Sequence, residues 1–353
     1  MNPNYILGLF QGDGSFNIKI HHKNSNNHIG RYLWLSASIN ISLHKSNENI
    51  IKDIKQYLGI GHYRIDNKNM CRFDINQIDD IYNKMIPFFL EYKLKGEKYK
   101  SFLMFKIIIT KLYNKEHYNK TTDNKNKFNP VLLNLINMAY LMNPINTNLK
   151  SRTNFIKYLN DKDIKLITSN LVYKKLLNEE IIKYPNNNNI NINYIQGLFD
   201  ADGSISISLQ YNKLNHLRFR ITFNITQDKF NKDVLDLVQQ YLDRGYIYKV
   251  DNTFKYDVKS IKDIDFIISK FDINWIKNNN TVRLYKLIYI KNIISLYKKN
   301  NTATIKTLED YKIILYNMYY ISKRENDLSV NDYINNTINN KPIVKIKNKD
   351  TFC

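Results

Sequence analysis

The chain has 353 residues, and its 53 lysines and arginines outnumber its 32 aspartates and glutamates, giving a formal charge of +21. This charge favours a polyanionic partner, and the absence of a long apolar span favours nucleic acid over a membrane. Two cysteines exclude a disulfide framework and a cysteine-rich zinc site, so a reducing compartment is expected.

The first predicted element is an apolar helix that begins near Asn2 and ends at Asp13. Asn2 is a suitable N-cap, and a proline follows it at the first helical position. Gly14 permits the left-handed geometry that stops a helix, which leaves the Asp13 carboxylate at the tip. The pattern returns later, since residues 5–16 read YILGLFQGDGSF and residues 194–205 read YIQGLFDADGSI. This duplication predicts two similar domains in tandem.

Each of these two helices carries small residues four positions apart on one face. They are Gly8, Gly12, Gly197 and Ala201. Such a face lets two helix backbones approach closely, so the two helices are expected to pack against each other. Packing would bring Asp13 and Asp202 to one seam, and paired carboxylates at a seam are typical of a shared metal site.

Three other interpretations of the repeated segment are possible. A membrane-spanning GxxxG helix needs about 20 apolar residues, and the apolar run here is about half that length. An EF-hand loop starting at Asp200 would need a glycine where Ile205 stands and an acid where Tyr211 stands. A core helix with a merely solvated terminal acid would not explain why both copies end in Asp-Gly-Ser.

The two segments resemble the motif of the LAGLIDADG homing endonucleases, in the single-chain form with two motifs. The second acid of that motif binds a divalent cation in the family, and it corresponds to Asp13 and Asp202. The first acid corresponds to Asp200 in the second copy, but the first copy has Gln11 there. The resemblance therefore implies Mg²⁺ as cofactor, with two or more divalent cations expected at the seam between the two domains. The implied metal-site residues are Asp13, Gly12, Asp202 and Ala201.

After each motif, residue periodicity predicts the element order α-β-β-α-β-β-α-α. In the first copy the elements after the motif helix are strands 15–21 and 31–42, helix 48–58, hairpin 62–65 with 72–75, and helices 78–89 and 98–113. In the second copy they are strands 204–210 and 215–226, helix 232–242, hairpin 247–250 with 255–258, and helices 261–271 and 281–297. The order resembles the αββαββα core of the family. It implies an α+β fold with pseudo-twofold symmetry, in which two antiparallel sheets form a DNA-binding saddle.

The duplication also sets the expected domain boundaries. Residues 1–113 and 194–300 form the two motif-bearing domains, and residues 114–193 form a partly helical linker. Residues 301–353 contain one amphipathic helix, near 308–321, and a basic tail from residue 326 that is expected to be frayed or disordered.

Alternation along the strands predicts a polar face on each sheet, opposite the apolar face. In the first copy this face carries Ser15, Asn17, Lys19, His21, Tyr32, Trp34, Ser36, Ser38 and Asn40. In the second it carries Ser204, Ser206, Ser208, Gln210, Arg218, Arg220, Thr222 and Asn224. The hairpins add Arg64, Arg72, Lys249 and Lys255. A polar sheet face can be simply solvated, but a basic, amide-rich and hydroxyl-rich face suits the major groove of DNA.

The resemblance implies further catalytic residues. Gln227 matches the polar residue that the family uses to order water near the metals, whereas the first copy has Leu43 there. Lys98, with Lys95 as an alternative, matches the family's basic residue in the first copy. In the second copy the only candidate for this role is Lys277.

The resemblance implies a monomeric, metal-dependent endonuclease that cuts double-stranded DNA at a long, non-palindromic target. One alternative is a group I intron maturase that binds RNA, alone or combined with nuclease activity, although a pure maturase does not need both motif acids. Another is a DNA-binding repressor that has lost cleavage. The richness in Asn, Ile, Lys, Tyr and Phe is what AT-rich codons give and indicates an organellar origin, so a mitochondrial matrix location is expected.

Overall fold

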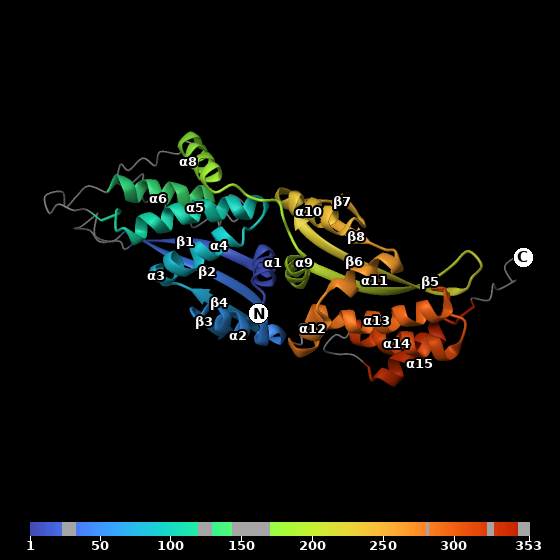
Figure 1. Ribbon diagram of the computed structural model, residues 1–353. Coiled ribbons are helices and arrows are strands. Elements are labelled where there is room, and N and C mark those ends of the chain that lie inside the picture. The colour runs from blue at the N-terminus through green and yellow to red at the C-terminus, as the bar shows by residue number, and fades with distance from the viewer. Residues whose placement is uncertain (23–32, 119–128, 143–169, 280–281, 323–327, 345–353) are drawn as a thin grey trace, which may run out of the picture. The chain divides into compact units, whose positions relative to one another are not determined.

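The computed structural model describes residues 1–22, 33–118, 129–142, 170–279, 282–322 and 328–344 (Figure 1). The chain divides into two compact units, residues 1–189 and 190–353. Each unit contains a four-stranded antiparallel sheet. In the part of the chain that the structure describes, no helix is both long enough and apolar enough to cross a membrane.

The first unit builds its sheet in the order β1-β2-β4-β3. Its strands are β1 (Gly14–His22), β2 (Leu33–His44), β3 (His62–Ile65) and β4 (Met70–Ile75). Its helices are α1 (Pro3–Asp13), α2 (Glu48–Leu58), α3 (Ile78–Asp80), the π-helical turn η2 (Ile81–Met85), α4 (Ile86–Glu91), α5 (Gly96–Tyr113), α6 (Pro130–Met142) and α8 (Asn170–Lys183). Helices α6 and α8 both contact α5 (Figure 1), so much of the segment expected to be a linker is packed onto this unit.

The second unit repeats the arrangement with the strand order β5-β6-β8-β7. Its strands are β5 (Gly203–Tyr211), β6 (Leu217–Asp228), β7 (Tyr246–Val250) and β8 (Thr253–Val258). Its helices are α9 (Ile192–Asp202), α10 (Lys232–Leu242), α11 (Ile261–Lys270), α12 (Ile273–Asn279), α13 (Val282–Asn300), α14 (Leu308–Ser322) and α15 (Val330–Asn340). The predicted element order is therefore confirmed in both copies, with α12 as an additional short helix in the second.

Both motif helices begin with an asparagine cap, as predicted. The Asn2 side-chain oxygen accepts a hydrogen bond from the Asn4 amide at 2.9 Å, and the Asn191 oxygen accepts one from the Tyr194 amide at 3.0 Å. Each cap satisfies one of the amides that the first turn of a helix leaves without an internal partner.

The motif helices end for a different reason from the one predicted. Gly14 and Gly203 are extended, with φ of −80° and −81°, so the expected left-handed conformation is wrong. A Cβ atom at Gly14 would overlap the Phe10 ring, and one at Gly203 would overlap the Phe199 ring. Glycine is required because the strand leaves the helix directly beside a buried aromatic ring.

Aromatic side chains fill the space between the motif helix and the sheet. In the first unit, the Phe16 ring lies 5.0 Å from those of Phe10 and Phe105, measured between centroids. In the second, the Phe199 and Phe223 rings stack at 4.4 Å. Burial of each such ring contributes about 1.5–3 kcal/mol, so this packing fixes which face of each sheet points inward.

The expectation of a frayed tail from residue 326 is wrong for residues 328–344. Ser329 caps α15 by accepting a hydrogen bond from the Asp332 amide at 3.2 Å. The Tyr319 hydroxyl of α14 donates to the Leu328 carbonyl at 3.0 Å, and the Tyr311 hydroxyl donates to the Lys341 carbonyl at 2.9 Å. These buried tyrosines anchor both ends of the segment; residues 323–327 and 345–353 lie outside the described part.

Candidate functional site

Lys98 lies at the end of the first motif helix. From the first turn of α5, its ammonium donates to the carbonyls of Phe10 at 3.1 Å, Gly12 at 3.1 Å and Gly14 at 2.8 Å. The last carbonyls of a helix lack internal partners and carry a partial negative charge, which a cation offsets. The carbonyls of Gly12 and Gly14 flank Asp13 in the chain, so a fixed positive charge stands next to the motif acid.

Lys95, the alternative to Lys98, points elsewhere. Its ammonium donates to the Asn187 carbonyl at 2.5 Å and to the Asn186 side chain at 3.3 Å. The side chain is buried, and this burial, with a smaller contribution from Lys93, lowers the pKa of Lys95 to about 8. The geometry therefore favours Lys98 as the basic residue beside the first motif acid.

Gln11 has a structural role that explains why an amide replaces the acid of the family motif. Its side chain is buried, accepts a hydrogen bond from the Lys95 amide at 2.9 Å and donates to the Lys95 carbonyl at 3.2 Å. An ionised carboxylate accepts but cannot donate, so only the amide satisfies both backbone groups. Lys95 immediately precedes α5, and Gln11 thereby positions the helix that carries Lys98.

The second motif acid has a side-chain partner. The buried Gln227 amide donates to Asp202 Oδ2 at 2.6 Å. Strand register accounts for this, because Gly203 pairs with Ile225 and Gln227 lies two residues further along β6. In the first unit Gly14 pairs with Ile41, so the equivalent position is Leu43, which is also buried. The asymmetry that the sequence predicted is therefore present in the geometry.

Arg283 was missed by the sequence analysis. Its guanidinium Nη1 donates to the Asp200 carbonyl near the end of α9 at 2.9 Å. Arg283 lies in the first turn of α13, and α13 corresponds to α5, so Arg283 takes the place that Lys98 has in the first unit. The available signal was a basic residue in the first turn of this predicted helix. Lys277 lies in α12, and its side chain is outside the described part of the structure.

The polar face predicted for the first sheet is formed by directly paired residues. The pairs are Ser15 with Asn40, Asn17 with Ser38, Lys19 with Ser36, and His21 with Trp34. Paired residues point to the same side of a sheet, so all eight share one face. The His21 and Trp34 rings stack with centroids 4.9 Å apart, and His21 Nε2 lies 2.7 Å from Ser36 Oγ. Tyr32 is outside the described residues.

The second sheet has an equivalent polar face. The pairs are Ser204 with Asn224, Ser206 with Thr222, Ser208 with Arg220, and Gln210 with Arg218. The three serines, Gln210 and Arg218 are exposed, whereas Asn224 is buried. The exposed members leave hydroxyl, amide and guanidinium groups available to a ligand.

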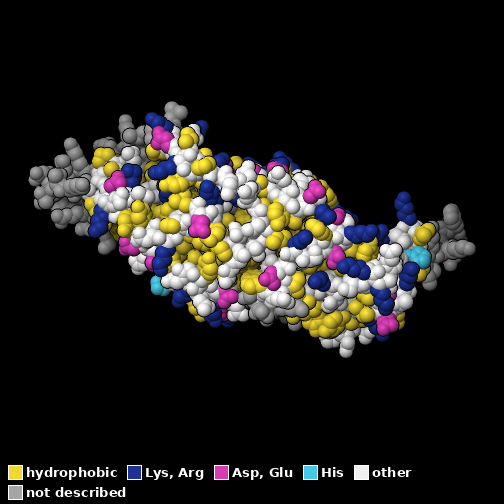
Figure 2. Space-filling model, viewed as in Figure 1, with side chains coloured by type: hydrophobic (Ala, Val, Ile, Leu, Met, Phe, Trp, Pro, Cys, Tyr) yellow, Lys and Arg dark blue, Asp and Glu magenta, His cyan; other side chains and the backbone are white. Residues whose placement is uncertain are grey.

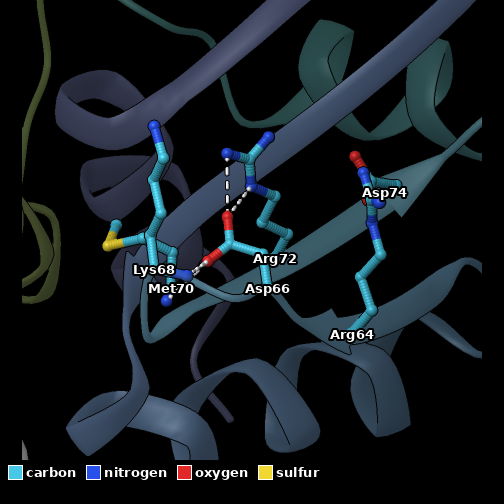
Figure 3. Close-up of polar contacts among 6 residues, drawn as sticks. All are labelled: Arg64, Asp66, Lys68, Met70, Arg72 and Asp74. Carbon is cyan, nitrogen blue, oxygen red and sulfur yellow. Dashed lines mark hydrogen bonds and ion pairs between the residues drawn. The ribbon is translucent and has the colours of Figure 1, made fainter.

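In the first unit's hairpin the predicted arginines lie opposite each other and are held by carboxylates (Figure 3). Arg72 Nη2 lies 3.0 Å from Asp66 Oδ2, and Arg64 Nε lies 3.2 Å from Asp74 Oδ2. The other oxygen of Asp66 accepts hydrogen bonds from the Met70 and Lys68 amides, and these bonds and Arg72 lower the pKa of Asp66. Both arginines remain substantially exposed.

In the second unit's hairpin the two predicted lysines face opposite sides. Lys255 pairs with Thr226 and Tyr248, which places it on the polar face. Lys249 pairs with Phe254, which in turn pairs with Gln227 on the inward face. The strand register therefore places Lys255, but not Lys249, on the side of the polar-face residues. A DNA contact by Lys249 stays a prediction.

Oxygen ligands for a hard cation are present at both motif ends. Among the described residues, no group of three or more histidines, cysteines and acids is gathered in one place. Asp13 and Asp202 each end a motif helix and are half-buried. Mg²⁺ is commonly held by one or two carboxylates together with phosphate oxygens, so these side chains fit such an ion.

The LAGLIDADG endonuclease family matches residues 6–109 and 195–290, more than half of the chain and both copies of the motif. The chain belongs to this family. The function class expected from the repeated motif, a site-specific DNA endonuclease, is confirmed.

The chain is also similar to individual members of the LAGLIDADG family. It is 28% identical over 229 residues to a probable intron-encoded DNA endonuclease 1 of Mycosarcoma maydis, covering 62% of this chain and 75% of that protein. It is 26% identical over 256 residues to a probable intron-encoded endonuclease 3 of Neurospora crassa, covering 70% of this chain but only 42% of that protein.

Two solved LAGLIDADG structures have a similar fold. I-SmaMI, bound to an uncleaved DNA target in the presence of calcium ions, gives a TM-score of 0.66 at 18% identity, covering 90% of this chain and 98% of that one. The meganuclease I-AabMI, bound to uncleaved DNA, gives a TM-score of 0.62 at 19% identity. The match covers 86% of this chain and 94% of that one. The predicted α+β class with two antiparallel sheets is therefore confirmed.

Proposed function

We propose that this LAGLIDADG endonuclease cleaves both strands of DNA as a monomer, at a long and non-palindromic target, with Mg²⁺ held by Asp13 and Asp202. The observation that carries the proposal is that both motif acids are retained at equivalent helix ends. Each helix end also binds a basic side chain, Lys98 in one unit and Arg283 in the other. A protein that only bound DNA or RNA would need neither acid.

The proposed reaction is hydrolysis of phosphodiester bonds. When bound, Mg²⁺ supplies Lewis acidity that activates water and stabilises the leaving oxygen. The carboxylates of Asp13 and Asp202 would each hold such an ion. Lys98 and Arg283 place fixed positive charge where negative charge develops on phosphate. Gln227 orients the Asp202 carboxylate and orders water on its side.

The polar faces of the two sheets are the proposed DNA-reading surfaces. Guanidinium, amide and hydroxyl groups can pair with base edges in the major groove, and a β-ribbon fits that groove. The faces differ between the units, since one stacks His21 on Trp34 where the other pairs Gln210 with Arg218. Two different surfaces would read two different half-sites. Lysine and arginine side chains spread over both units (Figure 2) would also attract the phosphate backbone.

We also infer a mitochondrial matrix location. Support comes from the richness in Asn, Ile, Lys, Tyr and Phe and from similarity to fungal proteins named as intron-encoded.

The decisive experiment incubates the purified protein with Mg²⁺ and the intron-less form of its host gene. Cleavage of both strands at one site is the expected result. Retention of the DNA without cutting would indicate a binding protein. Stimulation of splicing of the host group I intron, with no cutting of DNA, would indicate a maturase.

A further inference from the structure

Two C-terminal segments cover one edge of the second sheet. The first three residues of β6 pair with β5 on one side only. On the other side, β8 pairs with β6 from Phe223 onward and leaves the start of β6 without a β8 partner. On that other side the Leu217 amide donates to the Ile343 carbonyl at 2.7 Å, and the Leu217 carbonyl accepts from the Ile305 amide at 2.8 Å. The Phe219 amide donates to the Ala303 carbonyl at 3.1 Å. Backbone groups that an exposed strand edge would leave unpaired are thereby satisfied.

The register of these contacts places two added side chains on the polar face. Thr304 lies antiparallel and directly beside Arg218, and Val344 lies in the same way beside His216. Directly paired residues share a face, so Thr304 stands beside Arg218 and Gln210 on the predicted DNA-reading side. The neighbouring Ile305 is buried, as alternation requires.

The side chain of Thr304 is not needed to cover the edge. The hydrogen bonds to β6 come from the backbone of Ala303, Ile305 and Ile343. The Thr304 side chain is partly exposed and Val344 is 47% exposed. A hydroxyl can pair with any base edge or with a phosphate, and an apolar side chain can contact the methyl group of thymine.

We propose that these C-terminal segments form an additional part of the DNA-contacting surface of the second unit, with Thr304 and Val344 contacting the outermost base pairs of its half-site. The proposal rests on the proposed function. Arg218 pairs with Gln210, seven residues along β5 from Gly203, which follows the motif acid. At about 3.3 Å per residue, the length of β5 from Gly203 to Gln210 is roughly 23 Å, which equals about seven base pairs of DNA.

The test selects preferred targets from a library randomised across the target site, using the full chain, Thr304→Val and the double variant Thr304→Val/Val344→Ser. Valine keeps the shape of threonine and leaves the backbone pairing intact. Thr337→Val is the matched control, since the Thr337 hydroxyl donates within α15 to the Tyr333 carbonyl. Loss of one hydroxyl contact is expected to weaken binding about 2- to 10-fold.

The expected result is a loss of preference at one or two positions about seven base pairs from the cut on the second unit's side, larger in the double variant and absent in the control. An unchanged selection profile in both variants would overturn the inference, because the segments would then only cover the edge. A uniform loss at all positions with a lowered melting temperature would overturn it too. If the parent protein selects no DNA, the proposed function itself fails and takes this inference with it.

Discussion

The Gln227 amide donates a hydrogen bond to Asp202 Oδ2 at 2.6 Å, and the equivalent position near Asp13 is the apolar Leu43. One motif acid is therefore oriented by an amide that can also order water, whereas the first unit has a leucine at the equivalent position of its sheet. Two carboxylates with the same role thus have different surroundings, and the two strands of a target should be cut at different rates.

We expect Gln227→Leu to slow cleavage of one strand far more than the other. Leu43→Gln should speed the slower strand or leave it unchanged. End-labelling each strand of a supercoiled target measures the two nicking rates separately. Equal rates in the parent, with an equal loss for both strands in Gln227→Leu, would show that this asymmetry has no effect on catalysis.

The two motif acids should both be essential, because each holds metal for hydrolysis. Asp13→Asn and Asp202→Asn should each abolish double-strand cleavage while DNA binding remains within a few-fold, and chelation of Mg²⁺ should do the same to the parent. Asp79→Asn, at an exposed acid of α3, is the matched control. Gel-shift and plasmid-cleavage assays separate the two effects. Full double-strand cutting by either motif variant would refute the assignment.

Arg283→Ala should reduce nicking of one strand by about 10²- to 10³-fold, the usual effect of removing one preorganised electrostatic group. Lys98→Ala should act mainly on the other strand. Arg283→Lys should recover part of the rate, because lysine keeps a positive charge at the end of α9. A purely structural role for Arg283 would not depend on that charge. Lys100→Ala removes an exposed lysine that pairs with Glu97 and is the control. Wild-type nicking by Arg283→Ala would exclude this residue from the site.

DNA binding should weaken steeply with salt. The logarithm of the association constant should fall with the logarithm of the salt concentration by about 0.9 per phosphate contact. Lys255→Gln should reduce that slope by about one if its side chain meets a phosphate, whereas Lys249→Gln, on the opposite face, should not. Titrations at several salt concentrations measure the slopes. A parent slope equivalent to fewer than about three contacts would contradict an extended interface.

The stability of the protein should depend on Lys95 at mildly alkaline pH. The pKa of Lys95 is about 8 in the folded chain, against an ordinary value of 10.5. Between these values the unfolded chain binds more protons, so the free energy of unfolding should rise with pH. Above about pH 10 the raised pKa of Tyr99, about 12, acts in the opposite direction. Thermal unfolding of the parent and Lys95→Met at pH 7.5 to 9.5 checks this, and parallel pH profiles would contradict it.

The order of elements and the polar faces could be predicted because both depend on local periodicity. Alternation assigned every second residue from Ser204 to Gln210, and every second residue from Arg218 to Asn224, to one face of the sheet. The strand register confirms this assignment. The asparagine caps are equally local, since each cap oxygen accepts a hydrogen bond from an amide no more than three residues away.

The remaining features depend on contacts between distant parts of the chain. Gly14 is required by the Phe10 ring and not by a backbone angle. Arg283 lies inside α13, in its first turn, whereas the basic residue expected from the sequence, Lys277, lies before that helix. The ordered α15 depends on Tyr311 and Tyr319, and its own polar composition gives no sign of this.

If Arg64 and Arg72 contact bases, as the sequence predicts, the carboxylates that hold them should affect how strictly the target must match. An arginine released from a wrong base normally loses its hydrogen bonds, and that loss supports discrimination of about 1–3 kcal/mol per bidentate pair. In this protein Asp74 and Asp66 already pair with the two guanidinium groups in the absence of DNA. An arginine at a mismatched base would therefore keep a charged partner. Flatter base preference is expected at the positions these arginines read. An intron-encoded nuclease of this kind could then keep recognising its site while the host gene accumulates substitutions.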